Sequence, residues 1–385
     1  MPINDLYEKG VEPDKIQIPL ARSTIKEEEV KAVADVIASG WLIFGKNVKV
    51  FEDEFARLIG VKHAIAVNSG SSGLLVSLQA LGVGRDDEVI VPDMSFISTG
   101  TAGMYLGARP VFVDINLKDY CIDVEKIEEK ITDKTRVLLP VHYWGHTAEM
   151  DRILALAANY NLKVLEDSAE AHLATYRGER FAGTMGDLAI FSFTPSKPMT
   201  TGEGGMITTN DDDLADRCRK IINFGDYDKF DNRILGFNFR MQDMNGALGR
   251  VQLKRLPQSI DIRRKTGRFY TESLSDVGGV ICPVPRTETD SNYQIYPLRI
   301  DLDILSCTKE TFMRDMLEEG IHCRTYYPAF HRQRVFKELN DQGSYPNAEL
   351  FERSTFVLPI YPELSETDKE HIVKSVKKIA ERYQG

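Results

Sequence analysis

Short apolar runs alternate with amphipathic segments along the first half of the chain. The runs that we interpret as strands occupy positions 64–67, 88–91, 111–114, 137–141, 163–166, 188–193 and 205–209. Amphipathic segments separate most of them, and helices are expected at 74–81, 124–130 and 150–160. Strands that alternate with helices are typical of a layered α/β fold with a mostly parallel sheet. The pattern therefore predicts a large α/β layer with a mostly parallel, seven-stranded sheet between helices.

Two further helices are expected before the sheet begins. Thr24 and Glu27 have the spacing of a capping box, which predicts the start of the first helix. The segment 40–48 lacks periodicity and is interpreted as an exposed loop, and a second helix is expected at 48–58.

The pattern changes after the last predicted strand of the sheet. A polar segment at 226–238 predicts a long loop, and a helix at 241–256 is expected to stop at Pro257. Beyond it, helices are predicted at 260–275, at 309–319 and from Glu366 onward, with strands within 293–302. This change predicts a large domain over residues 1–250 and a smaller C-terminal α+β domain over residues 251–385.

Composition narrows the classes of partner. Of the 385 residues 42% are apolar and 28% are charged, and the net charge of −10 is spread without an acidic or basic block. This balance disfavours nucleic acid and anionic membranes as main partners. The first ten residues contain no apolar signal core, which predicts a cytoplasmic protein. Five scattered cysteines without a CxxC pair predict reduced, mostly buried thiols and no zinc site.

A single lysine, Lys197, follows the apolar run 188–193 directly, close to the hydroxyl of Ser192. Pro195 ends the strand because proline has no N–H for the ladder, and a Thr/Gly run after the lysine allows tight turns. An amine that is removed from water in this position loses its proton more easily and can attack a carbonyl. A solvated structural lysine fits the same position.

Polar side chains follow two other predicted strands. The segment 68–73, NSGSSG, opens a helix, and free N–H groups with serine hydroxyls there form a cradle suited to a phosphate, or a plain turn with a serine cap. Asp167 ends a strand, where a carboxylate pairs with a protonated ring nitrogen or caps the next helix. Glu170 lies near Asp167 if a helical turn begins there, while His172 fits a structural polar residue.

Phe96 follows a fourth strand, where its ring either stacks on a flat cofactor or packs in the core. In parallel sheets ligands lie outside the carboxyl ends of the strands, where all four features occur. An anion cradle, an aromatic plate, a carboxylate and a lysine match the anionic arm, flat ring, basic nitrogen and aldehyde of pyridoxal 5'-phosphate. Together they predict a site for that cofactor.

Motifs along nearly the whole chain share the pattern of one family. They are SGWLIFG, NSGSSGL, VPDMSFISTGTAGMYLGARPVFVDI, PVHYWGHTAEMD, LEDSAEAH, FSFTPSKPMTTGEGGMITTND, GFNFRMQDMNGALG and LPIYPEL. In these motifs the chain resembles the DegT/DnrJ/EryC1/StrS aminotransferases, which are pyridoxal-phosphate-dependent sugar aminotransferases of fold type I. The resemblance runs from about residue 18 to the C-terminus and implies that fold.

The resemblance also implies roles for single residues. Lys197 would hold the cofactor covalently and later move protons, Asp167 would bind the pyridine nitrogen, and Phe96 would stack on the ring. Glu170 stands where the family often has Gln or His near the ring hydroxyl, and Thr194 replaces a frequent His or Tyr.

Further matches concern the phosphate and the assembly. Ser71, Ser72 and Ser192 would hold the phosphate of the cofactor. Asn238 falls where a partner subunit usually reaches across to that phosphate, which implies a homodimer with shared active sites.

The implied reaction moves an amino group from L-glutamate to a keto-sugar, most simply a nucleotide-linked 4-keto-6-deoxyhexose, for amino-sugar biosynthesis in lipopolysaccharide or related glycans. Three alternatives remain: a sugar dehydratase, a transaminase of a free keto-sugar acid, and a non-catalytic sugar-binding subunit. Dehydrating relatives carry His in place of the Schiff-base lysine, whereas this chain has Lys197. The side chains that lie where relatives shape the acceptor site are Arg324, Tyr326, Tyr327 and His331.

Overall fold

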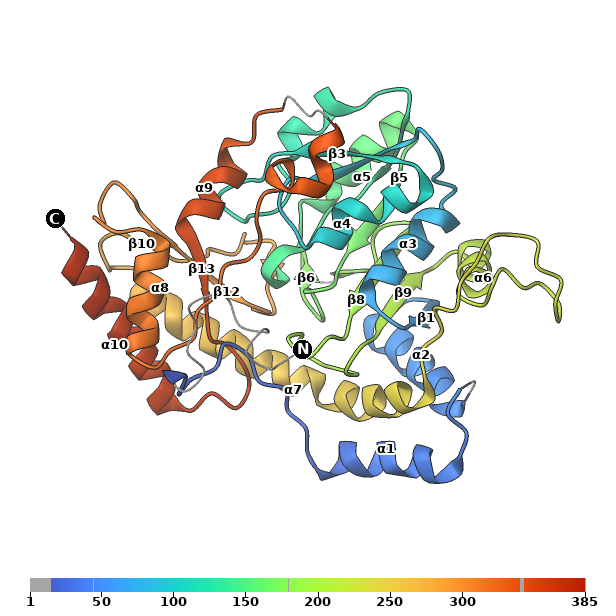
Figure 1. Ribbon diagram of the computed structural model, residues 1–385, viewed down its shortest axis with the longest axis horizontal. Coiled ribbons are helices and arrows are strands. Elements are labelled where there is room, and N and C mark those ends of the chain that lie inside the picture. The colour runs from blue at the N-terminus through green and yellow to red at the C-terminus, as the bar shows by residue number, and fades with distance from the viewer. Residues whose placement is uncertain (1–14, 44, 179, 340–342, 385) are drawn as a thin grey trace.

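The computed structural model describes residues 15–43, 45–178, 180–339 and 343–384. The first ten residues, for which no signal core is predicted, and Phe44 of the predicted loop at 40–48 lie outside this described part. Figure 1 shows a layered part around a sheet, a second part near the C-terminus, and one long helix, α7, that runs beneath the first and reaches the second.

The central sheet has seven strands in the order β1-β9-β8-β5-β4-β2-β3. They are β1 His63–Val67, β2 Glu88–Pro92, β3 Arg109–Val113, β4 Thr135–Leu138, β5 Lys163–Asp167, β8 Leu188–Ser192 and β9 Gly205–Thr209. Only β9 runs against its neighbours, because it pairs antiparallel with both β8 and β1 while the other pairs are parallel. Each strand begins and ends within three residues of a predicted one, so the predicted α/β sheet is confirmed.

Helices cover both faces of this sheet, which is why its strands are almost continuously apolar. Those of the layered part are α1 Glu27–Ser39, α2 Lys46–Ile59, α3 Gly70–Ala80, α4 Ile97–Thr101, α5 Met150–Tyr160 and α6 Asp212–Ile221. All five residues of β8 are buried. Beneath it, Phe51, Phe55, Phe191 and Phe193 form an aromatic cluster with α2, and this cluster anchors the start of the lysine loop.

Helix α7 (Asp243–Leu274) overturns one prediction. The expected stop at Pro257 is wrong, because the helix continues through the proline. A proline inside a helix removes one hydrogen bond and crowds the preceding turn, and this cost is of order 3 kcal/mol. Buried apolar residues on both sides offset it, namely Leu253, Leu256 and Ile260. The predicted domain boundary at residue 250 lies inside this helix, and the division into two domains stays a proposal.

Two local predictions near the N-terminal half are also wrong. Helix α1 begins with Lys26 as its N-cap, and Glu29, not Glu27, accepts the Lys26 backbone N–H at 2.9 Å. Glu29 is drawn inward because it pairs with Arg255 at 2.7 Å. The helix expected at 124–130 is a pair of 3-10 turns, η4 Val124–Lys126 and η5 Glu128–Lys130. Its buried residues are three apart, as a 3-10 turn requires.

The C-terminal part is α+β, as predicted. A three-stranded sheet is made of β10 Val280–Ile281, β12 Tyr296–Ile300 and β13 Thr355–Leu358, and its helices are α8 Lys309–Glu318, α9 Pro346–Ser354 and α10 Glu366–Tyr383. A small third sheet consists of β11 Thr289–Asp290, β6 Thr175–Tyr176 and β7 Arg180–Phe181. The remaining short turns are η3 Gly103–Leu106, η6 Tyr143–Gly145, η7 Phe330–Arg332 and η8 Arg334–Leu339.

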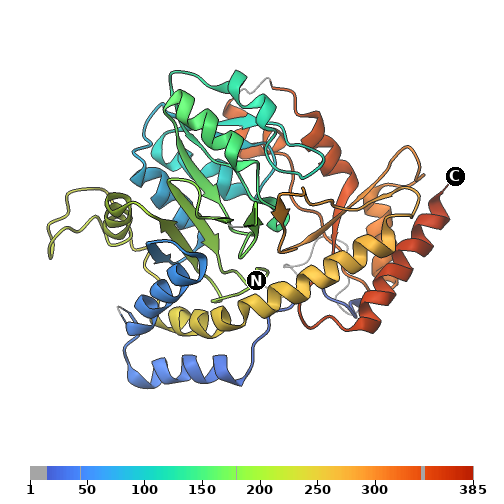
Figure 2. The same cartoon turned by 180° about the vertical axis from the view of Figure 1, so that it is seen from behind.

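A long loop follows α6 and extends away from the body of the molecule (Figure 2), as predicted for residues 226–238. Its apolar side chains are unusually exposed, at 89% for Phe230 and 84% for Leu235. All five cysteines are free thiols, and four of them are buried. None of the helices in the described ranges is both long and apolar enough to cross a lipid bilayer.

Candidate active site

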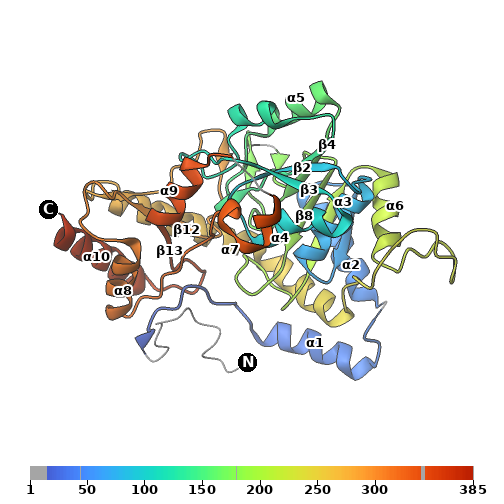
Figure 3. The ribbon, with the colours of Figure 1, turned by 45° about the horizontal axis from the view of Figure 1, so that its top comes forward.

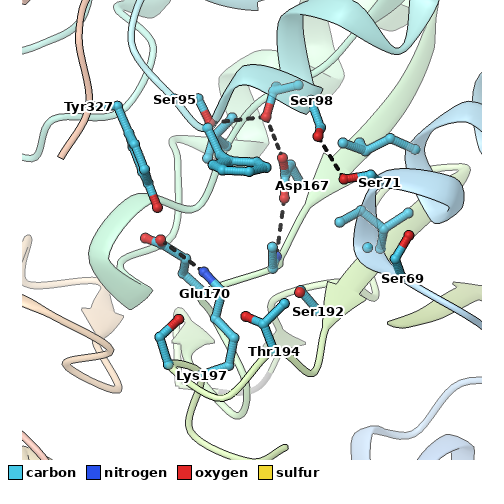
Figure 4. A pocket seen from close by; sticks show the side chains of 18 of the residues that line it. Ser69, Ser71, Ser95, Ser98, Asp167, Glu170, Ser192, Thr194, Lys197 and Tyr327 are labelled. Carbon is cyan, nitrogen blue, oxygen red and sulfur yellow. Dashed lines mark hydrogen bonds and ion pairs between the residues drawn. The ribbon is translucent and has the colours of Figure 1, made fainter. Parts of the chain in front are cut away.

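A cavity of about 460 Å³ opens where the strands of the central sheet reach their carboxyl ends. The segments that follow β1, β2, β5 and β8 form much of its wall, and residues of the C-terminal part close the remaining side. Its lining includes Gly70, Ser71, Ser98, Phe96, Thr99, Asp167, Glu170, Ser192, Lys197, Arg324, Tyr326 and Tyr327. Figure 4 shows that the side chains of Asp167, Glu170 and Lys197 and those of several serines converge on one space.

Lys197 presents its amine to this cavity. Its Nζ donates to Oε1 of Glu170 at 3.1 Å, and only 11% of the lysine side chain is exposed. The loop that carries it is fixed, because the Lys197 N–H donates to the Thr194 carbonyl at 3.0 Å and Gln294 Nε2 donates to the Ser196 carbonyl at 2.8 Å. The solvated reading of this lysine is therefore wrong.

The carboxylate of Glu170 is fixed by a hydrogen bond from the backbone. Its Oε2 accepts the Trp144 N–H at 3.0 Å, while the indole Nε1 of Trp144 donates to the Asp119 carbonyl at 2.8 Å. Trp144 itself has a left-handed backbone with a φ of 51°. The carboxylate is consequently aimed at the lysine amine (Figure 4).

Asp167 ends β5 beneath the cavity and is 4% exposed. Its Oδ2 accepts the Thr99 hydroxyl at 2.8 Å, and its Oδ1 accepts the Ala169 N–H at 3.2 Å. Burial raises the pKa of Asp167, which these two bonds and the charge of Lys197 oppose. Among the described residues no cation lies within ion-pair distance of it. A buried carboxylate of this kind suits a protonated ring nitrogen in the cavity.

Phe96 is 52% exposed and lines the cavity, so the core alternative for this residue is wrong. Its ring meets that of Tyr327 edge to face, with centroids 5.8 Å apart. The exposed part of the Phe96 ring therefore faces the cavity, where a flat group can stack on it.

The segment 68–73 begins α3 as predicted, but its serines have different tasks. Ser69 is the N-cap, and its hydroxyl accepts the Ser72 N–H at 3.1 Å. The Ser72 hydroxyl donates to Asn68 Oδ1 at 2.6 Å, and Ser72 is 6% exposed. The structure therefore does not bring the Ser72 hydroxyl to the cavity wall, whereas Gly70 and Ser71 line it.

The anion cradle is built from both sides of the helix start. A Cβ at Gly70 would lie 2.9 Å from Cβ of Ser192, so only glycine leaves room there. The Ser71 and Ser98 hydroxyls are 2.6 Å apart at the cavity wall. Free N–H groups in the first turn of α3 add the positive end of the helix dipole. A phosphate fits this arrangement of N–H groups and hydroxyls.

Asn238 lies outside the cavity. It is exposed and lines a neighbouring hollow of about 360 Å³ with Asn68, Glu203 and Arg240. Glu203 lines both spaces, so the hollow adjoins the cavity. A single chain thus does not bring Asn238 to the anion cradle.

His172 is a core residue, in line with its structural reading. It is 1% exposed among the rings of Phe191 and Phe193, and burial lowers its pKa to about 3. It lies beneath the lysine loop and stays neutral there.

The C-terminal part supplies three of the four residues named for the acceptor side. Arg324, Tyr326 and Tyr327 line the cavity. His331 does not, because its Nδ1 lies 2.6 Å from Oδ2 of the buried Asp93. Asp93 directly precedes the segment that carries Phe96, so this pair joins the C-terminal part to the cofactor side of the cavity.

Sequence reasoning missed several residues of the site. The clearest are Thr99, Ser98 and Trp144, which hold or flank the predicted residues. Ser98 and Thr99 fall in the first turn after Phe96, where a helix start could have been suspected. The Trp144 contact depends on a left-handed backbone that no motif announces.

Pyridoxal 5'-phosphate fits the residues present on three independent observations. The cradle at Gly70 can accept an anion, and the buried carboxylate of Asp167 can pair with a cation. The amine of Lys197 is held in place at the wall of the same cavity. The half-exposed ring of Phe96 supplies a stacking surface.

Comparison with known proteins gives a consistent result. The DegT/DnrJ/EryC1/StrS aminotransferase family matches residues 23–377. GDP-perosamine synthase of Caulobacter vibrioides is 35% identical over 373 residues, which are 95% of this chain and 99% of that protein. The structure of DesV from S. venezuelae is 33% identical with a TM-score of 0.88, covering 94% of this chain and 100% of that one. Spr1654 of Streptococcus pneumoniae in its PLP form is 26% identical with a TM-score of 0.89, covering 95% and 99%.

Proposed function

Since this chain belongs to the DegT/DnrJ/EryC1/StrS aminotransferase family, whose members are PLP-dependent sugar aminotransferases, we propose that it transfers an amino group from L-glutamate to a nucleotide-linked keto-sugar. The favoured acceptor class is a 4-keto-6-deoxyhexose, whose aminated product enters a surface glycan such as lipopolysaccharide. The observation that carries the proposal is the convergence of the Lys197 amine and the Asp167 carboxylate on one cavity.

Bound pyridoxal 5'-phosphate supplies an electron sink that makes the α-hydrogen of an attached amino compound acidic. The residues of this chain would hold it in three places. Gly70, Ser71 and Ser192 would bind the phosphate, Phe96 would stack on the ring, and Asp167 would favour a protonated ring nitrogen. The bonds from Thr99 and Ala169 favour the charged form of that carboxylate and oppose the effect of burial, which raises its pKa.

Lys197 has a second role as general base and acid. Its Nζ would act as the single positioned base that takes the α-proton of the amino donor and later returns that proton. Glu170 lies 3.1 Å from that nitrogen and orients it between the two transfers.

The acceptor side of the cavity belongs to the C-terminal part. The hydroxyl of Tyr327 is directed toward Glu170 (Figure 4), and burial raises the pKa of Tyr327 well above its ordinary value. A phenol that stays neutral donates a hydrogen bond to a keto or hydroxyl oxygen of the sugar. Arg324 lies at the same wall and offers a cation to an anionic substituent.

We also propose a homodimer with shared active sites. The exposed apolar side chains of Ile43, Phe230, Leu235 and Phe237 line the hollow that contains Asn238 or lie on the loop before it. Apolar side chains that protrude in this number are typical of an interface with another chain. In the proposed dimer, the amide of Asn238 reaches the anion cradle of the second copy.

A mixing experiment tests this arrangement. Asn238→Asp places a carboxylate against the phosphate and is expected to impair every site of its own homodimer, as Lys197→Ala does. When the two variants are mixed and re-associated, about a quarter of wild-type activity is expected, because half of the dimers are mixed and each carries one intact site. No recovery, with mixed dimers verified by mass spectrometry, contradicts shared sites.

The proposed reaction is tested by a screen of UDP-, GDP- and dTDP-linked keto-sugars with L-glutamate, read by mass spectrometry. Transamination replaces the keto oxygen by an amino group, and 2-oxoglutarate accumulates in equal amount. A product that has only lost water supports the dehydratase alternative. Turnover of a free keto-sugar acid alone supports the second alternative, and absence of any product contradicts an aminotransferase.

A further inference from the structure

A second cavity, of about 240 Å³, lies on the other side of the lysine loop and shares Lys197 with the site described above. Four parts of the chain close it: the N-terminal segment before α1, the loop at Lys197–Thr200, the middle of α7, and the turn after β13. Figure 3 shows how the N-terminal segment crosses from the C-terminal part to α1. This crossing segment forms one wall of the cavity.

The lining of this cavity is strongly cationic. Arg22, Lys26, Lys197, Arg255 and Arg263 line it, together with the carboxylate of Glu363. Two of these cations are paired: Lys197 with Glu170 at 3.1 Å, and Arg255 with Glu28 at 2.8 Å and Glu29 at 2.7 Å. In the described part of the chain, Arg22, Lys26 and Arg263 have no carboxylate within 4.0 Å. The five cations face four carboxylates, those of Glu28, Glu29, Glu170 and Glu363, so one positive charge is left over.

Arg263 is the most unusual of these cations. It is 3% exposed, and its Nη1 donates only to backbone carbonyls, those of Tyr293, Gln294 and Ile360, at 3.5, 3.2 and 2.8 Å. Among the described residues its Nε has no hydrogen-bond partner. Burial lowers the pKa of Arg263 to about 10, and the charge of Glu363 opposes this effect. A buried guanidinium with an unused donor and no directly paired carboxylate destabilises the fold unless an anion completes it.

The hydroxyls of the crossing segment tie the cavity to the lysine loop. Ser23 Oγ donates to the Pro195 carbonyl at 2.9 Å, and the Thr24 hydroxyl donates to the Glu363 carboxylate. Arg22 and Lys26 are exposed at the mouth on either side of these hydroxyls. An anion that enters can thus meet two mobile cations outside and one fixed guanidinium inside.

We propose that this cavity is a binding site for a small anion, whose oxygens are held by Arg263 at the inner wall and by Arg22 and Lys26 at the mouth. The planar fork of an arginine matches the paired oxygens of a phosphate or carboxylate. Inorganic phosphate and dicarboxylic acids share this chemistry. The occupant links the N-terminal segment to α7 behind Lys197 and stabilises the lysine loop.

Calorimetric titration of the holoenzyme, with the cofactor already filling the phosphate cradle, tests the site in a buffer free of oxyanions. Inorganic phosphate and succinate are the two probes. We expect one bound anion per chain for at least one probe, and a rise in melting temperature with its concentration. Binding by phosphate alone or by succinate alone identifies the natural class of occupant. Binding of neither probe overturns the proposal.

Variants locate the anion. Arg22→Ala/Lys26→Ala removes two exposed cations and is expected to weaken binding at least tenfold. Lys31→Ala/Lys377→Ala removes the same charge from exposed positions elsewhere and is expected to change it less than twofold. Arg263→Lys keeps the charge but loses the fork, so affinity also falls if the variant folds. Equal affinity in the first pair and the control pair contradicts the assignment. These readouts need no turnover, so they are independent of the proposed reaction.

Discussion

Replacing Lys197 with alanine is expected to reduce transamination by at least about 10⁴-fold, because the chain loses both its covalent attachment point and its general base. The cavity around the lysine has room for the smaller side chain, so the circular dichroism spectrum should stay that of the wild type. The measurement is 2-oxoglutarate formation from L-glutamate in the presence of the best acceptor found.

Lys197→Arg is the matched control for this loss. Arginine keeps a positive charge beside Glu170, but its guanidinium is too basic to act as a nucleophile at neutral pH. We expect the arginine variant to be as inactive as the alanine variant while it retains more of the wild-type stability. Substantial activity in either variant would show that another group does the chemistry.

The second large effect concerns Asp167. Asp167→Asn keeps a hydrogen-bond acceptor for Thr99 but removes the negative charge that, in our proposal, holds the ring nitrogen protonated. We expect kcat to fall by about 10²–10³-fold, the size found when one preorganised electrostatic partner of a reacting group is removed. Cofactor binding should weaken less, because the phosphate cradle is untouched. Steady-state kinetics together with a cofactor titration separate the two effects.

Thr99→Val separates charge from hydrogen bonding at this position. It removes the 2.8 Å bond to Asp167 and leaves the carboxylate in place. A single hydrogen bond to a charged group contributes about 1.5–3 kcal/mol, so a loss of about 10- to 100-fold is expected. If Thr99→Val costs as much as Asp167→Asn, the charge of Asp167 is not the decisive property.

The sheet could be predicted from sequence because its strands are short and buried on both faces, as β8 illustrates. Apolar runs bounded by Gly, Pro and polar residues leave few other structures open. The full length of helix α7 could not be predicted from sequence, because the effect of Pro257 depends on the tertiary packing of the residues around it. Local rules give the intrinsic cost of a proline, and only the folded structure shows what offsets it.

The residues of the site also divide into those that the sequence predicts and those that only the folded structure reveals. Lys197, Asp167 and Phe96 could be named because each follows a strand, and parallel strands bring their ends together. The ion pair between Lys197 and Glu170 joins positions 27 residues apart and rests on the Trp144 backbone, so no local pattern reveals it. Ser72 was named through a motif, but the first turn of α3 directs its hydroxyl away from the cavity.

Reduction of the holoenzyme with borohydride, followed by peptide mass spectrometry, tests whether Lys197 carries the cofactor. Reduction makes a bond between the cofactor and an amine permanent, so the added mass marks the residue that carries it. We expect one modified residue, Lys197, and loss of the modification when L-glutamate is added before the reductant. A modification on another lysine, or none on the cofactor-saturated protein, would contradict this assignment.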